Sequence, residues 1–91
     1  MTSLSEQFGL VIRRHRQARR WSQEELAERA GLSRSYGGEV ERGNSIPSLE
    51  TIAKLAQALG LEASTLVAEV ESQGRLANRY RPPLLQAQAG K

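Results

Sequence analysis

The sequence has no cysteine and no aspartate, and it has a single histidine. Without cysteine, neither a disulfide framework nor a thiolate metal site can form. With so few side chains of the usual catalytic kinds, general-base and nucleophilic arrangements have few candidates. No metal-ligand spacing and no glycine-rich phosphate loop occurs either. We therefore expect no catalytic residues, no metal, no cofactor and no small-molecule substrate, and we predict that the protein is not an enzyme.

Long apolar runs are also missing. The longest covers residues 10–12, whereas a membrane-spanning helix needs about 20 apolar residues. The N-terminus lacks the apolar block of a signal peptide. We therefore expect a cytoplasmic protein that makes no contact with a membrane. A chain of 91 residues has room for one domain.

The charge is moderately positive, at +3, and most of the basic residues are arginines. The planar fork of arginine suits phosphate groups and guanine edges better than the point charge of lysine. Five arginines fall within residues 13–20. This cluster is either a solvated helix face or a source of phosphate contacts by at least one of Arg13, Arg14, Arg19 and Arg20.

Apolar residues recur at helical spacing, without the sustained alternation of a strand, which favours an all-α fold. The spacing predicts five helices, at about residues 4–20, 23–30, 34–42, 49–59 and 64–72. Serines stand where helix N-caps are expected and glycines where helices should end, namely Ser22, Ser33 and Ser48, and Gly31, Gly43 and Gly60. Among the residues expected to face the core are Leu4 in the first helix and Leu49 and Ala53 in the fourth.

The composition changes near the C-terminus, where glycine and proline become frequent and Gln86–Gly90 is low in complexity. We predict one domain over residues 1–72 and a tail or arm over 73–91. The alternative is that residues 75–81 form a short sixth helix before the prolines.

The segment from Gln23 to Arg42 predicts two short helices joined by a turn with glycine, which is typical of a helix-turn-helix. Ala27 stands at the fifth position, where the two helices cross and little room exists. Gly31 stands at the ninth, in the turn. Short helix pairs also occur in proteins that never touch DNA, so this spacing leaves the function open.

The run WSQEELAERAGLS, followed by EVERGNSIPSLETIAKLAQALG, resembles the phage-repressor and Cro-like (Xre) helix-turn-helix family. That family includes restriction–modification controller proteins, and the resemblance covers about residues 4–70. It implies an all-α, five-helix lambda-repressor-like domain. It also implies a homodimeric transcription regulator, such as a repressor, that binds a pseudo-palindromic operator in double-stranded DNA with its third helix in the major groove. Such a protein is expected to be nucleoid-associated.

Carried over by position, the resemblance implies that three residues of the third helix read base edges and that three residues near it hold phosphate. The base-reading set is Arg34, Ser35 and Glu39, and the phosphate-binding set is Gln23, Arg42 and Asn44. Tyr36 is a further phosphate candidate through its hydroxyl, with packing as the alternative. The resemblance also implies a structural ion pair between Arg16 and Glu41, which ties the first helix to the third.

The chemistry of these side chains suits the implied roles. Arg34 lies in the first turn of its helix, and arginine can bind guanine O6 and N7 with two hydrogen bonds. Glu39 can accept a hydrogen bond from cytosine N4 or repel phosphate at wrong sites. Gln23 opens a helix, where the free backbone amides favour a phosphate.

Two glycines depart from the family pattern. Gly37 stands where a large aliphatic residue is expected, and Gly38 follows it. Because glycine costs a helix interior about 1 kcal/mol relative to alanine, we predict a loosely packed third helix with empty space beside Gly37.

Two further questions concern partners. Leu66, Val67 and Val70 on the fifth helix are candidates for a dimer interface, with completion of the monomer core as the alternative. A second hypothesis for function keeps the fold but makes it a protein-interaction module, antitoxin-like or adaptor. The two glycines and the tail motivate that hypothesis.

Overall fold

The computed structural model describes residues 2–78, which form five helices and no strand. The helices are α1 (Leu4–Ala18), α2 (Gln23–Ala30), α3 (Arg34–Arg42), α4 (Leu49–Leu59) and α5 (Ala63–Asn78). The predicted all-α, five-helix fold is confirmed, and the bounds of α2, α3 and α4 coincide with the predicted ones. Residues 79–91, which include most of the predicted tail, lie outside the described residues.

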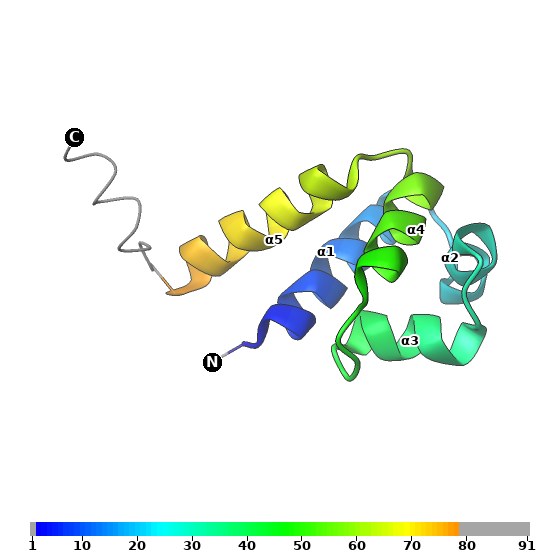
Figure 1. Cartoon of the computed structure of the whole chain (residues 1–91), viewed down its shortest axis with the longest axis horizontal. Helices are drawn as coiled ribbons and strands as arrows, with labels where there is room; N and C mark the ends of the chain where they lie inside the picture. Colours follow the sequence, from blue (N-terminus) through cyan, green and yellow to red (C-terminus); the bar gives the residue numbers. More distant parts are fainter. Residues whose placement is uncertain (1, 79–91) are drawn as a thin grey trace.

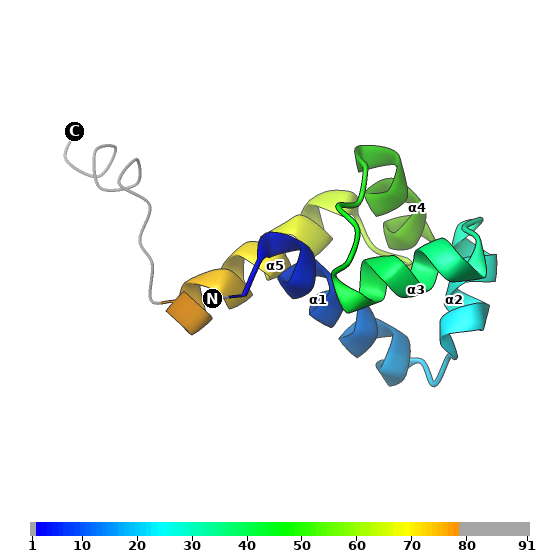
Figure 2. The same ribbon diagram turned by 90° about the horizontal axis from the view of Figure 1, so that it is seen from below.

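The helices form two groups, α1 with α5 and α2 with α3, which contact each other directly through α1 and α3 and also through α4. Helices α1 and α5 lie side by side at one end of the molecule, and α2 and α3 meet at the other (Figure 1). Seen from below, α3 is the nearest helix, and none of the other described helices covers it on that side (Figure 2). One long side of α3 is therefore free of the rest of the fold.

Local signals set the ends of the central helices. The hydroxyl groups of Ser22, Ser33 and Ser48 accept hydrogen bonds from the backbone three residues on, as N-caps do. Each of these helices ends at a glycine with a left-handed backbone, such as Gly31 with φ +70°. That conformation is nearly free of strain only for glycine, so the chain can turn sharply between α2 and α3.

The core lies between α1, α4 and α5 and reaches into α2 and α3. Its largest fully buried side chains are Val11, Ile12, Val40 and Leu66. Three residues expected in the core are instead on the surface: Leu4, Leu49 and Ala53. For these residues the predicted place in the core is wrong. Leu4 and Leu49 are the first residues of α1 and α4, where the helices project beyond the core, and Ala53 lies off the buried face of α4.

Helix α5 is longer than predicted, since it continues to Asn78 instead of ending near residue 72. Gly74, the first glycine of the C-terminal segment where the composition change predicts a helix end, lies within the helix and against the side chain of Gln7 on α1. A Cβ atom built on Gly74 would come within 2.8 Å of the Gln7 Oε1 atom. The nearest atoms all belong to the Gln7 side chain, so Gly74 lies within α5 without a requirement for glycine in the backbone at this position.

Candidate nucleic-acid interface

Helices α2 and α3 cross at Ala27 and Gly37. Ala27 is buried, as the spacing predicted. A Cβ atom built on Gly37 would lie only 3.1 Å from the Ala27 Cβ atom. The predicted empty space beside Gly37 is therefore wrong, because the backbone of α3 lies so close to Ala27 of α2 that even a Cβ atom would be tightly packed there.

Helix α3 is fixed to α1 by a buried ion pair between Arg16 and Glu41. The Nε atom of Arg16 donates to Glu41 Oε2 at 2.9 Å, and its Nη2 atom donates to Oε1 at 2.6 Å. Arg16 also donates to the backbone oxygen of Trp21 at 2.8 Å. Only 12% of the Arg16 side chain and 4% of the Glu41 side chain are exposed. The structure thus brings together the two residues that the family resemblance paired.

A second anchor of α3 was missed in the sequence. Gly9 on α1 lies directly against the backbone of α3, and a Cβ atom there would overlap the carbonyl oxygen of Glu41. Only glycine permits helices to approach this closely. No sequence signal marks this contact, because Gly9 stands inside an otherwise ordinary helical pattern.

The free side of α3 carries the three predicted base-reading residues. Arg34 and Ser35 are exposed in its first turn, and Glu39 lies half-buried one turn later. Each charged residue has a partner: Arg34 pairs with Glu24 of α2, and Glu39 pairs with Arg42 at 3.2 Å. These pairs lie on the surface, where water competes with them and each contributes little to stability.

Tyr36 is used within the fold. Its hydroxyl oxygen lies 3.0 Å from the hydroxyl oxygen of Thr51 on α4, and Thr51 in turn accepts a hydrogen bond from Ser48. The ring packs against the core. Packing, the alternative considered for Tyr36, is thus present, and its phosphate contact stays a prediction.

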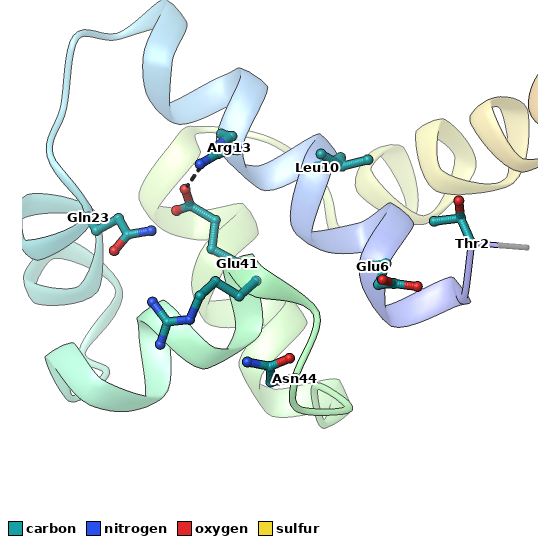
Figure 3. A pocket seen from close by; sticks show the side chains of 8 residues that line it. Thr2, Glu6, Leu10, Arg13, Gln23, Glu41 and Asn44 are labelled. Atoms are coloured by element: carbon teal, nitrogen blue, oxygen red, sulfur yellow. Dashed lines mark ion pairs between the residues drawn. The ribbon is translucent and has the colours of Figure 1, made fainter.

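The predicted phosphate-binding residues meet in one groove of about 590 Å³ between α1 and the α2–α3 pair, the α1–α3 groove. It is lined by Thr2, Glu6, Leu10, Arg13, Gln23, Glu41, Arg42 and Asn44. Figure 3 shows Gln23 of α2 and Asn44, which follows α3, at the groove with Glu41 between the helices. The three phosphate-binding residues that the family resemblance implied thus line one concave surface, whereas Tyr36 is not part of its lining.

At the other end of the groove, Glu6 belongs to the N-cap of α1. Its carboxylate accepts a hydrogen bond from the backbone N–H of Ser3 at 2.9 Å, which lowers the pKa of Glu6. Glu6 therefore stays ionised, and this end of the groove is acidic.

An apolar patch lies on another part of the surface, where the start of α1, the loop before α4 and one side of α5 meet. It encloses a hollow of about 310 Å³ lined mainly by Leu4, Phe8, Ile46, Pro47, Leu49, Ile52, Val67 and Val70. Ile46 and Leu49 are 86% and 85% exposed. Of the three candidates for a dimer interface, Leu66 and Val70 are buried in the monomer core, and Val67 is exposed at this patch.

No described helix has the length and apolar character that crossing a membrane requires. The described residues also hold no cluster of three or more potential metal-ligating side chains.

The α2–turn–α3 pair, with its glycine turn and alanine crossing, defines a helix-turn-helix protein. The chain belongs to the helix-turn-helix family, which matches residues 12–66. It is 44% identical over 61 residues to the immunity repressor protein of Bacillus phage phi105, covering 67% of this chain and 42% of the repressor. The chain spans less than half the length of the curated relatives it first matches, 42%, 40% and 32% for three of them.

Two solved structures are similar over most of their length. The restriction-modification controller protein C.AhdI from Aeromonas hydrophila is 48% identical, with a TM-score of 0.66 over 68% of this chain and 94% of the controller. The clp gene regulator ClgR from Corynebacterium glutamicum is 29% identical, with a TM-score of 0.78 over 86% of this chain and 83% of the regulator. The relatives are regulators, as the family resemblance implied.

Proposed function

We propose that the chain is a sequence-specific DNA-binding transcriptional regulator. It binds a pseudo-palindromic operator as a homodimer, with α3 of each subunit in the major groove. Its partner is double-stranded DNA, so its place in the cell is the cytoplasm, at the nucleoid. The names of its relatives, a phage repressor and a restriction–modification controller among them, support this class of function.

The position of α3 carries the proposal. One side of the helix is held by the buried Val40 and by Gly37, which lies against α2, while Ser35, Glu39 and Arg42 lie on the uncovered side and Arg34 is exposed in the first turn. A recognition helix requires this arrangement, since it must enter a groove while the fold fixes its angle. The α1–α3 groove lies beside it and supplies the amide and guanidinium donors that hold a sugar–phosphate strand.

The residues divide into two roles. We propose that Arg34, Ser35 and Glu39 read bases, with Arg34 bound to a guanine edge. Gln23, Arg42, Asn44 and Tyr36 contact phosphate and set the position of the protein. On binding, Arg34 and Arg42 exchange their surface carboxylate partners, Glu24 and Glu39, for DNA.

The test compares Arg34→Ala with Arg42→Ala on duplexes recovered by selection from random-sequence DNA. Arg34→Ala should lose discrimination at one base step in each half-site, by about 1–3 kcal/mol, because the bidentate guanine contact is gone. Arg42→Ala should weaken all sequences by a similar factor and reduce the salt dependence. The proposal fails if selection recovers no preferred duplex, or if both variants lose affinity evenly across sequences.

The apolar patch is the surface we assign to the homodimer. Exposed apolar clusters rimmed by polar residues commonly mark protein–protein contacts, and this one joins Ile46, Leu49 and Val67 from three segments. A second copy is the expected occupant, because a pseudo-palindromic operator with half-sites about 34–36 Å apart requires two recognition helices.

Leu49→Glu should convert the dimer to a monomer in sedimentation equilibrium without unfolding it, since Leu49 is almost fully exposed. Leu10→Glu is the matched control, because Leu10 is exposed in the α1–α3 groove and lies outside the patch. A parent chain that is monomeric at all concentrations, or two variants that behave alike, would refute this interface. A patch that instead captures a different protein would favour the alternative interaction-module function.

A further inference from the structure

The groove beside α3 has a basic end that includes Arg13, one of the four arginines for which the sequence leaves a phosphate contact open. Arg13 is the only arginine within residues 13–20 that lines the α1–α3 groove of the described structure. Figure 3 shows Arg13 of α1 and Gln23 of α2 at the same part of the groove, on the side away from Glu6 and Thr2. A cationic and an amide side chain from different helices thus face one space.

The other arginines of the cluster are directed elsewhere. Arg14 pairs with Glu69 on α5 at 3.6 Å. Arg19 donates to the backbone oxygen of Leu59 at 2.6 Å and to that of His15 at 2.8 Å, so its guanidinium fastens the end of α1 to the end of α4. Arg20 lies exposed in the turn that follows α1 and is not part of the groove lining.

The guanidinium of Arg13 is available to a ligand. Its Nε atom lies 3.7 Å from Glu41 Oε1, beyond the usual hydrogen-bond distance of about 2.7–3.2 Å. Among the described residues Arg13 makes no hydrogen bond, and 54% of its side chain is exposed. Glu41 does not depend on it, because Arg16 already donates three hydrogen bonds to that carboxylate.

We propose that Arg13 is a DNA phosphate-binding residue. Together with Gln23, it clasps one backbone phosphate at the basic end of the α1–α3 groove, while Glu41 stays paired with Arg16. The contact makes α1 part of the DNA-binding surface and is independent of base sequence. This inference rests on the proposed function, because it needs a duplex lying along α3.

The test uses the full chain and a duplex recovered by selection from random-sequence DNA, with binding measured over a range of salt concentrations. Arg13→Gln should lower the slope of log affinity against log salt by about 0.9 for each subunit, since one phosphate contact is lost. Arg14→Gln is the matched control: Arg14 is its neighbour, is 53% exposed and also has one carboxylate within 4 Å. It should leave the slope unchanged, although the change in charge is the same.

Arg13→Lys should keep the slope, because an ammonium group neutralises a phosphate equally well, and thermal unfolding should show that all three variants are folded. Equal slopes for Arg13→Gln and Arg14→Gln would overturn the inference. The variant Arg42→Ala distinguishes a wrong assignment of Arg13 from a failure of the proposed function. If it lowers the slope while Arg13→Gln does not, Arg13 alone is misassigned; if the parent chain does not bind the duplex, the proposed function fails and the inference fails with it.

Discussion

Two arginine–glutamate ion pairs of this molecule have the same chemical groups but differ in burial. Arg16 and Glu41 are buried between α1 and α3 and share three hydrogen bonds. The pair of Arg34 with Glu24 lies on the outer side of the helix-turn-helix, where 71% and 61% of the two side chains are exposed. The buried pair fixes the angle of α3, whereas the exposed pair is weak enough to be exchanged for another partner.

The difference teaches that charge alone does not mark the binding surface. In a chain with many arginines, burial and hydrogen bonding determine which guanidinium groups stabilise the fold and which are available to bind a ligand. By this criterion Arg16 and Arg19 are structural, and Arg13, Arg14, Arg34 and Arg42 are available. Position then separates Arg13 from Arg14, because Arg13 lines the α1–α3 groove and Arg14 does not.

The largest effect is expected for Arg16→Ala. The substitution leaves the Glu41 carboxylate buried with only the distant Arg13 as a partner, and breaking a buried pair in this way costs about 3–5 kcal/mol. Urea denaturation followed by circular dichroism should show this loss in the free energy of unfolding. Arg14→Ala, which removes an exposed pair from the same helix, should cost no more than about 1 kcal/mol. Equal losses of unfolding free energy in Arg16→Ala and Arg14→Ala would contradict the distinction between the structural Arg16 and the surface Arg14.

A smaller effect on stability is expected for Glu24→Gln, which frees Arg34. Because the pair is exposed, the free energy of unfolding should change by less than about 1 kcal/mol. Affinity for the selected duplex should rise, since Arg34 loses a competing partner and a negative charge leaves the surface. The control is Glu28→Gln, which makes the same change on α2 at an exposed residue without an ion pair among the described residues. A rise of equal size in both variants would mean that net charge, and not the Arg34 pair, is responsible.

The sequence predicts the helices of this fold well because the signals at their ends are local. Serine N-caps and left-handed glycines depend on a few neighbouring residues, and they place α2, α3 and α4 correctly. Gly74 carries the same signal of a helix end, but α5 continues through it to Asn78, where it lies beside Gln7 of α1, so the predicted end near residue 72 is wrong. A contact between helices distant in sequence cannot be inferred from one helix alone.

The same limit applies to the candidate site. Helical spacing identifies an apolar face but does not distinguish core from interface. It therefore puts Leu49 in the core, although Leu49 is exposed, and leaves Leu66 open between core and interface, although Leu66 is fully buried. The pairing of Arg16 with Glu41 came from the family resemblance, not from spacing. The direction of Arg13 depends on how α1 crosses α3 over Gly9, which only the three-dimensional fold determines.

The most direct measurement is the NMR spectrum of the arginine Nε–Hε groups with and without a duplex recovered by selection. If α3 and the groove beside it form the DNA-binding surface, the signals of Arg34 and Arg42 should shift on addition of DNA, and that of Arg13 with them. The signal of Arg16 should stay in place, because its hydrogen bonds to Glu41 are retained. Unchanged signals for Arg34 and Arg42, with shifts confined to Arg14, Arg20 or Arg29, would place the DNA on another face of the molecule.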